Sequence, residues 1–228
     1  MALARTCERA GSGQAPRVRP FPVYIFDVDG TLVDSADDIC GAVIEVLASI
    51  PCRPVTRAGL TRYIGVHLIE MFRDLLPDYT PEQLEQLIGS YRSFYRAREH
   101  RATRLYPGVK EALAALAGRK ATATTKATAG TRAVLEKFGL LEYFDHVQGT
   151  DGLPYKPAPD VVLASLAALE ARPEDCLFVG DTAADMEAGR AAGVRICAVR
   201  YGYGDLAEMA RFDPDYWIDD LRELASGL

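Results

Sequence analysis

Short apolar segments alternate with amphipathic segments through the second half of the chain, and this alternation limits the folds available to it. It starts after Pro107 and Gly108. In order, the segments are Val109–Leu116, Ala121–Thr124, Thr131–Phe138, His146–Gln148, Val161–Leu169, Cys176–Val179, Asp185–Ala192 and Ile196–Val199. Such alternation is typical of βα units, in which a parallel sheet carries helices on both faces. We therefore predict an α/β core.

The first half of the chain begins with a strand and continues with helices. The apolar run Val23–Phe26 is typical of a buried strand. Ala36–Ile50 has helical periodicity, and Thr80 with Gln83 forms the pattern of a capping box that starts another helix. The predicted organisation is a flexible N-terminal tail at 1–20, an α/β core at 21–36 and 104–228, and a helical insert at 37–103. We expect pivots between core and insert near Ser35 and Arg104.

Composition excludes several classes of protein. The chain has 228 residues, of which 49% are hydrophobic and 25% charged, so it is neither disordered nor a coiled coil. Its net charge of -6 argues against binding to nucleic acid or to anionic membranes. No apolar run approaches the ~20 residues of a membrane span. These features predict a partner that is a small molecule rather than nucleic acid or membrane.

The five cysteines are scattered and form no Cys-x-x-Cys pair. They support neither a zinc site nor a disulfide framework, so we expect a cytoplasmic protein. The first twenty residues carry four arginines against one glutamate, a composition that fits either a transit peptide or a frayed tail. The tail is the simpler interpretation.

The strongest local signal is Asp27-Val28-Asp29-Gly30, which follows the first predicted strand. Residues two apart at the end of a strand point the same way, so both carboxylates are expected at the carboxyl edge of the sheet, where ligands bind in open α/β folds. Gly30 permits a tight turn that presents backbone N–H groups to an anion. The alternative is a turn with solvated aspartates, which the four preceding hydrophobic residues make the poorer interpretation.

Three more candidate motifs follow along the chain. Thr124 and Thr125 come after a predicted strand, and their hydroxyls and the next helix N-terminus suit a phosphate. Lys156 is a single cation ahead of prolines and a helix. Asp181 and Asp185 follow another strand and are hard oxygen ligands. Each motif alone has an ordinary alternative: a threonine-rich strand end, a surface lysine, or Asp181 as the cap of the next helix.

The order of these motifs resembles the haloacid dehalogenase-like hydrolase superfamily, and the resemblance covers Phe21 to Leu224. It implies a Rossmann-like core with an inserted α-helical cap. Within the superfamily, four segments resemble the phosphoglycolate phosphatase group. They are Asp34-Ser35, Tyr106–Val109, Lys156–Pro159 and Tyr201–Gly204.

The resemblance implies a role for each motif residue. Asp27 is expected to be the nucleophile that takes the phosphoryl group as an aspartyl-phosphate. Asp29 is expected to protonate the leaving alcohol and then to deprotonate the attacking water. The expected phosphoryl-binding groups are Thr124, Thr125, Lys156 and backbone N–H groups near Val28, Asp29 and Thr125. The expected Mg²⁺ ligands are Asp27, the backbone carbonyl of Asp29, Asp181 and, directly or through water, Asp185.

A divalent cation has a clear physical purpose in such a site. An anionic nucleophile must approach an anionic phosphate, and two unit charges ~4 Å apart repel by roughly 4 kcal/mol at an effective dielectric of about 20. A cation between them removes that repulsion. Thr125 stands where the family commonly has Asn, and because its backbone N–H is retained we expect activity to persist.

The insert is expected to select the substrate. Its loop-like segment 62–67 suggests Arg62, Gly65 and His67 as specificity residues, with Arg62 or His67 meeting a substrate carboxylate. The alternative is a surface arginine and a packed histidine. Tyr91, Phe94 and Tyr95 have the spacing of a helical core face, and Arg92 and Arg96 that of a solvated face.

The function predicted from these observations is Mg²⁺-dependent hydrolysis of a small phosphorylated metabolite, with 2-phosphoglycolate the leading candidate, by a monomer or homodimer. Sugar phosphates and pyrophosphate are alternatives. A phosphomutase of the β-phosphoglucomutase type fits less well, because the first cap helix lacks its histidine. Asp29 disfavours dehalogenation, and the retention of Asp27, Asp29 and Lys156 disfavours a non-catalytic binding protein.

Overall fold

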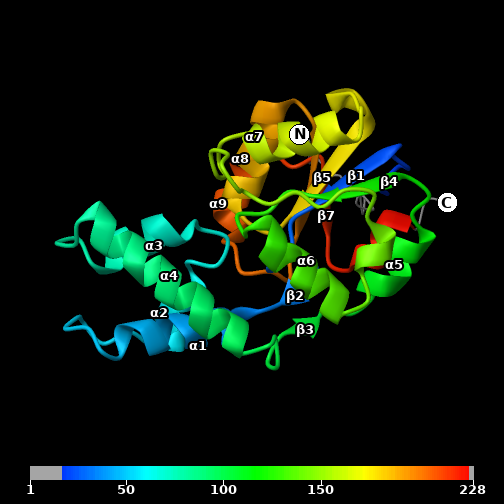
Figure 1. Cartoon of the computed structure of the whole chain (residues 1–228). Coiled ribbons are helices and arrows are strands. Elements are labelled where there is room, and N and C mark those ends of the chain that lie inside the picture. The colour runs from blue at the N-terminus through cyan, green and yellow to red at the C-terminus, as the bar shows by residue number, and fades with distance from the viewer. Residues whose placement is uncertain (1–16, 226–228) are drawn as a thin grey trace, which may run out of the picture.

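A computed structural model describes residues 17–225 and confirms the α/β class, with a Rossmann-like parallel sheet at its centre (Figure 1). The five strands are parallel and lie in the order β4-β1-β5-β6-β7. Their bounds are β1 Val23–Phe26, β4 Arg119–Thr122, β5 Cys176–Gly180, β6 Arg195–Val199 and β7 Tyr216–Ile218. Strand β1 pairs on both sides, so the residue that follows it leaves the sheet near the middle of its carboxyl edge.

Helices cover both faces of this sheet, as the alternation predicts. Consecutive β1 residues enter different cores: Tyr24 and Phe26 belong to one hydrophobic cluster, Val23 and Ile25 to the other. This two-faced burial explains why the strand is apolar throughout. Helices α5 and α6 contribute to the first cluster, and α7, α8 and α9 to the second. Their bounds are α5 Val109–Ala115, α6 Thr128–Lys137, α7 Asp160–Ala168, α8 Ala183–Ala192 and α9 Leu206–Ala210.

The insert is helical and lies to one side of the sheet (Figure 1). Its helices are α1 Ala36–Leu47, α2 Arg57–Thr61, α3 Leu68–Leu75 and α4 Pro81–Ala97. They bury a third hydrophobic cluster of their own. The segments entering and leaving the insert pair as an antiparallel ladder of β2 (Val33–Asp34) and β3 (Arg104–Leu105). The domain limits at 37–103 and the pivots stay predictions.

Some details differ from those expected. The segment His146–Gln148, expected to be strand-like, forms only an isolated bridge from His146 to Ala121. The predicted first helix ends at Leu47. The capping box at Thr80 is confirmed, with its backbone N–H donating to Gln83 Oε1 (2.8 Å).

The N-terminal segment predicted as a tail is described only from residue 17 onward, and residues 1–16 lie outside the described part. Within it, Val18 is buried in the same cluster as β1, so ordered packing starts before residue 20. Across residues 17–225, the structure contains no helix with the length and hydropathy needed to cross a bilayer.

Candidate active site

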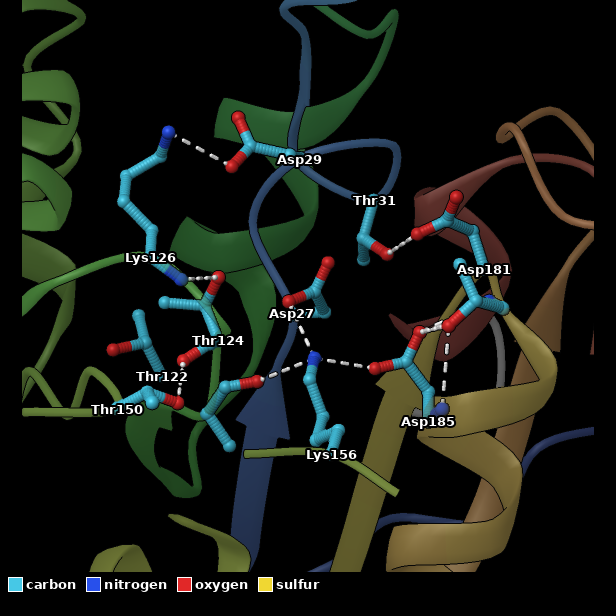
Figure 2. A network of polar contacts seen from close by, with 12 residues as sticks. Asp27, Asp29, Thr31, Thr122, Thr124, Lys126, Thr150, Lys156, Asp181 and Asp185 are labelled. Atoms are coloured by element: carbon cyan, nitrogen blue, oxygen red, sulfur yellow. Dashed lines mark hydrogen bonds and ion pairs between the residues drawn. The ribbon is translucent and has the colours of Figure 1, made fainter. Parts of the chain in front are cut away.

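The carboxyl ends of β1 and β5 bring together three buried charged groups. Lys156 Nζ donates to Asp27 Oδ1 (2.7 Å) and to Asp185 Oδ1 (2.5 Å). It also donates to the backbone carbonyl of Ala123 (3.0 Å), just beyond β4. Figure 2 shows the ammonium group between the two carboxylates. Residues far apart in the chain therefore meet at one edge of the sheet, as their order predicts.

Asp181 joins this group from the end of β5 and is held by its own partners. Its carboxylate accepts from Thr31 Oγ1 (3.0 Å) and from the backbone N–H of Tyr203 (2.9 Å). Gly30 packs directly against it: with φ of +96°, a Cβ there would lie 2.1 Å from Asp181 Oδ2. Glycine is thus required at position 30, both by its left-handed backbone conformation and by its close contact with Asp181.

Helix α8 is capped by Thr182 and not by Asp181. Thr182 Oγ1 accepts from the backbone N–H of Asp185 (3.3 Å), and Asp185 Oδ2 accepts from the backbone N–H of Thr182 (2.9 Å). This capping box satisfies the first turn of the helix. The alternative in which Asp181 serves as the helix cap is therefore wrong, and its carboxylate faces the other acids.

The carboxylates of this cluster carry more negative charge than Lys156 balances. Carboxylate oxygens of Asp27, Asp181 and Asp185 all lie within 4.8 Å of one another, so the three could hold a metal ion. Burial raises the pKa of Asp27 to about 7 despite the pull of Lys156, with Asp185 and Asp29 adding repulsion. Burial, with repulsion from the carboxylates of Asp185 and Asp27, raises the pKa of Asp181 well above its ordinary value. The donor set and its uncompensated charge suit a hard divalent cation.

Asp29 is buried close by but its side chain has different partners. Ser35 Oγ donates to its Oδ1 (2.6 Å), and Lys126 Nζ lies 3.0 Å from its Oδ2. The chain turns directly after β1, where the backbone N–H groups of Leu32 and Val33 donate to the carbonyl of Val28 (2.9 and 3.0 Å). Asp27 and Asp29 both lie at the carboxyl edge of the sheet, as expected, but their side chains have different hydrogen-bond and ion-pair partners. Their carboxylates serve two separate polar groups (Figure 2).

The predicted phosphoryl-binding threonines lie at the same edge. Thr124 is buried, its Oγ1 accepts from the backbone N–H of Lys126 (3.3 Å), and its carbonyl accepts from Thr150 Oγ1 (3.1 Å). Thr125 lines a cavity between the core and the insert, together with Asp29 and Lys126. The segment after β4 therefore connects the acid cluster to that cavity.

A family model described as haloacid dehalogenase-like hydrolase matches residues 24–199, most of the chain. The chain belongs to the haloacid dehalogenase-like hydrolases. It is 35% identical over 212 residues, 89% of this chain and 78% of the relative, to phosphoglycolate phosphatase 1 of Pseudomonas aeruginosa. It is 29% identical to pyrophosphatase PpaX of Halalkalibacterium halodurans, over 88% of this chain and 93% of the relative. A haloacid dehalogenase-like family protein from Streptococcus pneumoniae has a TM-score of 0.79 and 25% identity, covering 90% of this chain and 96% of that one.

The resemblance stated from the four motifs is thus confirmed at the level of the family, and the hydrolase class follows from it. In this haloacid dehalogenase-like hydrolase, the cavity between core and insert has a volume of about 620 Å³. Such a volume lies within the range of small-molecule sites.

Two of the three expected specificity residues reach this cavity. Gly65 and His67 line it, whereas Arg62 is exposed outside it, with its guanidinium 3.6 Å from Asp74. The His67 ring stacks on Tyr155 (4.2 Å between centroids). Burial, and the nearby charge of Arg92, lower the pKa of His67. A neutral histidine is a weaker partner for a carboxylate than the sequence interpretation requires. The specificity roles of these residues stay predictions.

Sequence reasoning missed Lys126 and one role of Tyr95. Lys126 is largely buried beside Asp29, with 11% of its side chain exposed, and its ammonium group donates to Tyr95 Oη (3.1 Å) of helix α4. The only signal was its position directly after Thr125.

The aromatic residues of helix α4 only partly follow the prediction. Tyr91 and Tyr95 join the hydrophobic cluster of the insert as predicted, but they also line the cavity. Phe94 is 38% exposed, which contradicts its predicted place in that core. Arg92 and Arg96 are exposed yet line the cavity too.

Proposed function

We propose that this hydrolase is a Mg²⁺-dependent phosphatase that transfers a phosphoryl group to Asp27 and then to water. The observation that carries the proposal is the buried Asp27 carboxylate, paired with Lys156 at 2.7 Å and grouped with Asp181 and Asp185. A buried carboxylate held by a cation, with a second acid nearby, is the arrangement that covalent phosphoryl transfer requires.

In this proposal the residues divide the work by position. Lys156 holds Asp27 with one oxygen committed, so the other oxygen is available to attack phosphorus. Asp29 lies at the cavity side, where it would protonate the leaving oxygen and afterwards take a proton from the attacking water. Backbone N–H groups at Asp29 and Thr125 would bind the phosphoryl oxygens. Because Thr125 retains its backbone N–H, we expect activity to persist with Thr in place of Asn.

The proposed Mg²⁺ would be held by Asp27, Asp181 and Asp185, with the Asp29 carbonyl as the further predicted ligand. When bound, the ion supplies positive charge that offsets the repulsion between carboxylate and phosphate. The raised pKa values of Asp27 and Asp181 support this assignment, because they show that Lys156 alone does not balance the cluster.

The leading substrate candidate is 2-phosphoglycolate, after the name of the Pseudomonas aeruginosa relative. Pyrophosphate is the second candidate, favoured by the PpaX relative. Both are small molecules with a second anionic group close to the transferred phosphate. We expect the enzyme to act in the cytoplasm, as a monomer or homodimer.

The test is phosphate release from a panel of phosphoesters, with Mg²⁺ and with chelator. The panel contains 2-phosphoglycolate, sugar phosphates, nucleotides and pyrophosphate. Mg²⁺-dependent release that is greatest on 2-phosphoglycolate supports the whole proposal, and greatest release on pyrophosphate replaces the substrate.

Asp27→Asn is the control, because it keeps the shape of the side chain and removes the nucleophile. It is expected to fold normally and to lose turnover by several orders of magnitude. An active Asp27→Asn enzyme would overturn the nucleophile assignment.

A further inference from the structure

We infer that Lys126 and Tyr95 form a subsite for a second anionic group of the substrate, a carboxylate separated from the ester oxygen by one methylene carbon. The inference rests on the proposed phosphatase function and deepens it. It names the residues that would select an anionic leaving group. Both line the cavity, Lys126 from the core and Tyr95 from helix α4 of the insert.

The ammonium group of Lys126 has more hydrogen-bond donors than it has acceptors among the described residues. A lysine ammonium group has three donors. Lys156 uses all three on protein acceptors: Asp27, Asp185 and the Ala123 carbonyl. Within residues 17–225, Lys126 has two such acceptors, Asp29 and the hydroxyl of Tyr95. One donor of a buried cation that lines a cavity is therefore available to a ligand.

The hydroxyl group of Tyr95 provides a second hydrogen-bond donor beside Lys126. Its hydroxyl oxygen accepts from Lys126, which leaves its proton free to be donated. Burial raises the pKa of Tyr95, so the hydroxyl stays protonated at neutral pH. The ring of Tyr95 also lies 4.5 Å from the Lys126 ammonium, a cation–π contact that fixes the position of the charge. Together the two side chains present one N–H and one O–H, which suits the two oxygens of a carboxylate.

Lys126 lies close to the residue that is proposed to protonate the leaving oxygen. Lys126 Nζ lies 3.0 Å from Asp29 Oδ2, and Asp29 is the proposed acid for the leaving oxygen. A group bound by Lys126 must therefore be only a few bonds from that oxygen. A carboxylate separated from it by a single methylene satisfies this limit, whereas an anion at the far end of a long chain does not.

The size of the cavity alone would select poorly among small phosphorylated substrates. The cavity of about 620 Å³ admits molecules considerably larger than a phosphorylated two-carbon acid. Selection must then depend on charge. Arg92 and Arg96 add positive charge from helix α4, but they are exposed, whereas Lys126 is buried at the end of the cavity nearest Asp29. Charge in a buried position is screened least by solvent.

The experiment compares two substrates in the full-length enzyme: 2-phosphoglycolate and 2-hydroxyethyl phosphate, in which a hydroxymethyl group replaces the carboxylate. Lys126→Met is expected to lower kcat/KM for 2-phosphoglycolate by about 100-fold and for the neutral ester far less, the size expected for a lost hydrogen bond to a charged group. Tyr95→Phe is expected to lower the ratio of the two values by about 5-fold. Lys137→Met, on the exposed face of α6, is the matched control and should leave the ratio unchanged.

An equal loss on both substrates would overturn the inference, since Lys126 would then act through Asp29 on the chemical step. So would a wild-type enzyme that prefers the neutral ester. If neither ester is hydrolysed, the proposed function has failed, and the subsite is judged by calorimetric binding to Asp27→Asn protein with and without Lys126→Met. Equal weakening of the two ligands there would overturn the subsite as well, and selective weakening of 2-phosphoglycolate would support it.

Discussion

Two lysines at the carboxyl edge of the sheet, one buried and one largely buried, differ in how many of their hydrogen-bond donors the protein uses. Lys156 makes three hydrogen bonds to groups of the core and its side chain is 1% exposed. Lys126 bridges the core residue Asp29 and the insert residue Tyr95, and its side chain is 11% exposed beside the cavity. The first completes a charge arrangement that the core assembles alone. The second connects two parts of the chain and retains a donor for something else.

The difference shows how stability and selectivity are separated in this molecule. Burial lowers the pKa of both lysines, yet neighbouring carboxylates raise it, Asp185 and Asp27 for Lys156 and Asp29 for Lys126. Both therefore remain charged. Of the two, only Lys126 has a partner on α4, so only Lys126 would lose a protein partner if the insert moved.

The comparison is tested most severely by Lys156→Met. Removing this cation leaves the buried carboxylates of Asp27 and Asp185 without their partner, and breaking such a buried pair costs about 3 to 5 kcal/mol. We expect the free energy of unfolding in chelator, measured with urea, to fall by that amount, and turnover to be lost. Lys126→Met should destabilise the protein considerably less, because water in the cavity can solvate Asp29. Equal destabilisation by the two variants would break the distinction.

The acid cluster should respond to Mg²⁺, and the region of Lys126 should not. An ion that binds only the folded state at 100 times its dissociation constant stabilises it by about 2.7 kcal/mol. We expect this rise in the free energy of unfolding with the wild-type protein and with Lys126→Met. It should disappear with Asp181→Asn, which keeps the hydrogen bond from Thr31 but removes a carboxylate. Retention of the full Mg²⁺ effect in Asp181→Asn would remove this residue from the metal site.

The pH dependence of that effect follows from the raised pKa of Asp27. In chelator, a carboxyl with a folded pKa of about 7 binds more protons than the unfolded chain above its model value of 3.8. Its contribution to stability therefore falls as the pH rises through about 7. Because the ion prefers the ionised carboxylate, the stabilisation by Mg²⁺ should be larger at about pH 8 than at about pH 6. Thermal unfolding with and without Mg²⁺ at both pH values checks this. A stabilisation by Mg²⁺ that becomes smaller as the pH rises would contradict the raised pKa of Asp27.

The core site was more predictable from sequence than the insert side. Asp27 follows four apolar residues that are typical of a buried strand, and Asp181 follows another such strand. In a parallel sheet these ends meet at one edge, so their convergence required no knowledge of the tertiary packing. The direction of Asp29 could not be derived in this way, since it depends on the turn that closes on the Val28 carbonyl.

Lys126 illustrates what local sequence does not contain. Its burial depends on Tyr95, thirty-one positions earlier in the chain, and on how helix α4 packs over the segment after β4. A lysine next to two threonines has no periodicity that distinguishes it from a surface residue. The same limit applies to Gly65, where the insert closely approaches Thr182 of the core.

Gly65 offers a smaller perturbation confined to the insert side. Its φ is +90°, and a Cβ there would lie 2.9 Å from Thr182 Cγ2, so Gly65→Ala introduces backbone strain and a clash with the core. We expect destabilisation of about 1 kcal/mol and a rise in KM, with the Mg²⁺ effect unchanged. Gly89→Ala in α4 is the matched control, since a Cβ there meets nothing within 4 Å, and it should stabilise the protein by about 0.5 to 1 kcal/mol. The same sign for both variants would contradict this placement of Gly65.

The smallest effect is expected at Arg62, the specificity residue that the sequence suggests and the structure places outside the cavity. Its guanidinium contacts Tyr63 Oη (2.7 Å) and Asp74 on the exposed surface, where ion pairs contribute little. Arg62→Ala should therefore change kcat/KM for 2-phosphoglycolate less than about 2-fold, in contrast to the loss expected for Lys126→Met. Steady-state kinetics of the two variants side by side decides between them. A large loss at Arg62 would mean that the exposed loop, and not the buried lysine, recognises the carboxylate.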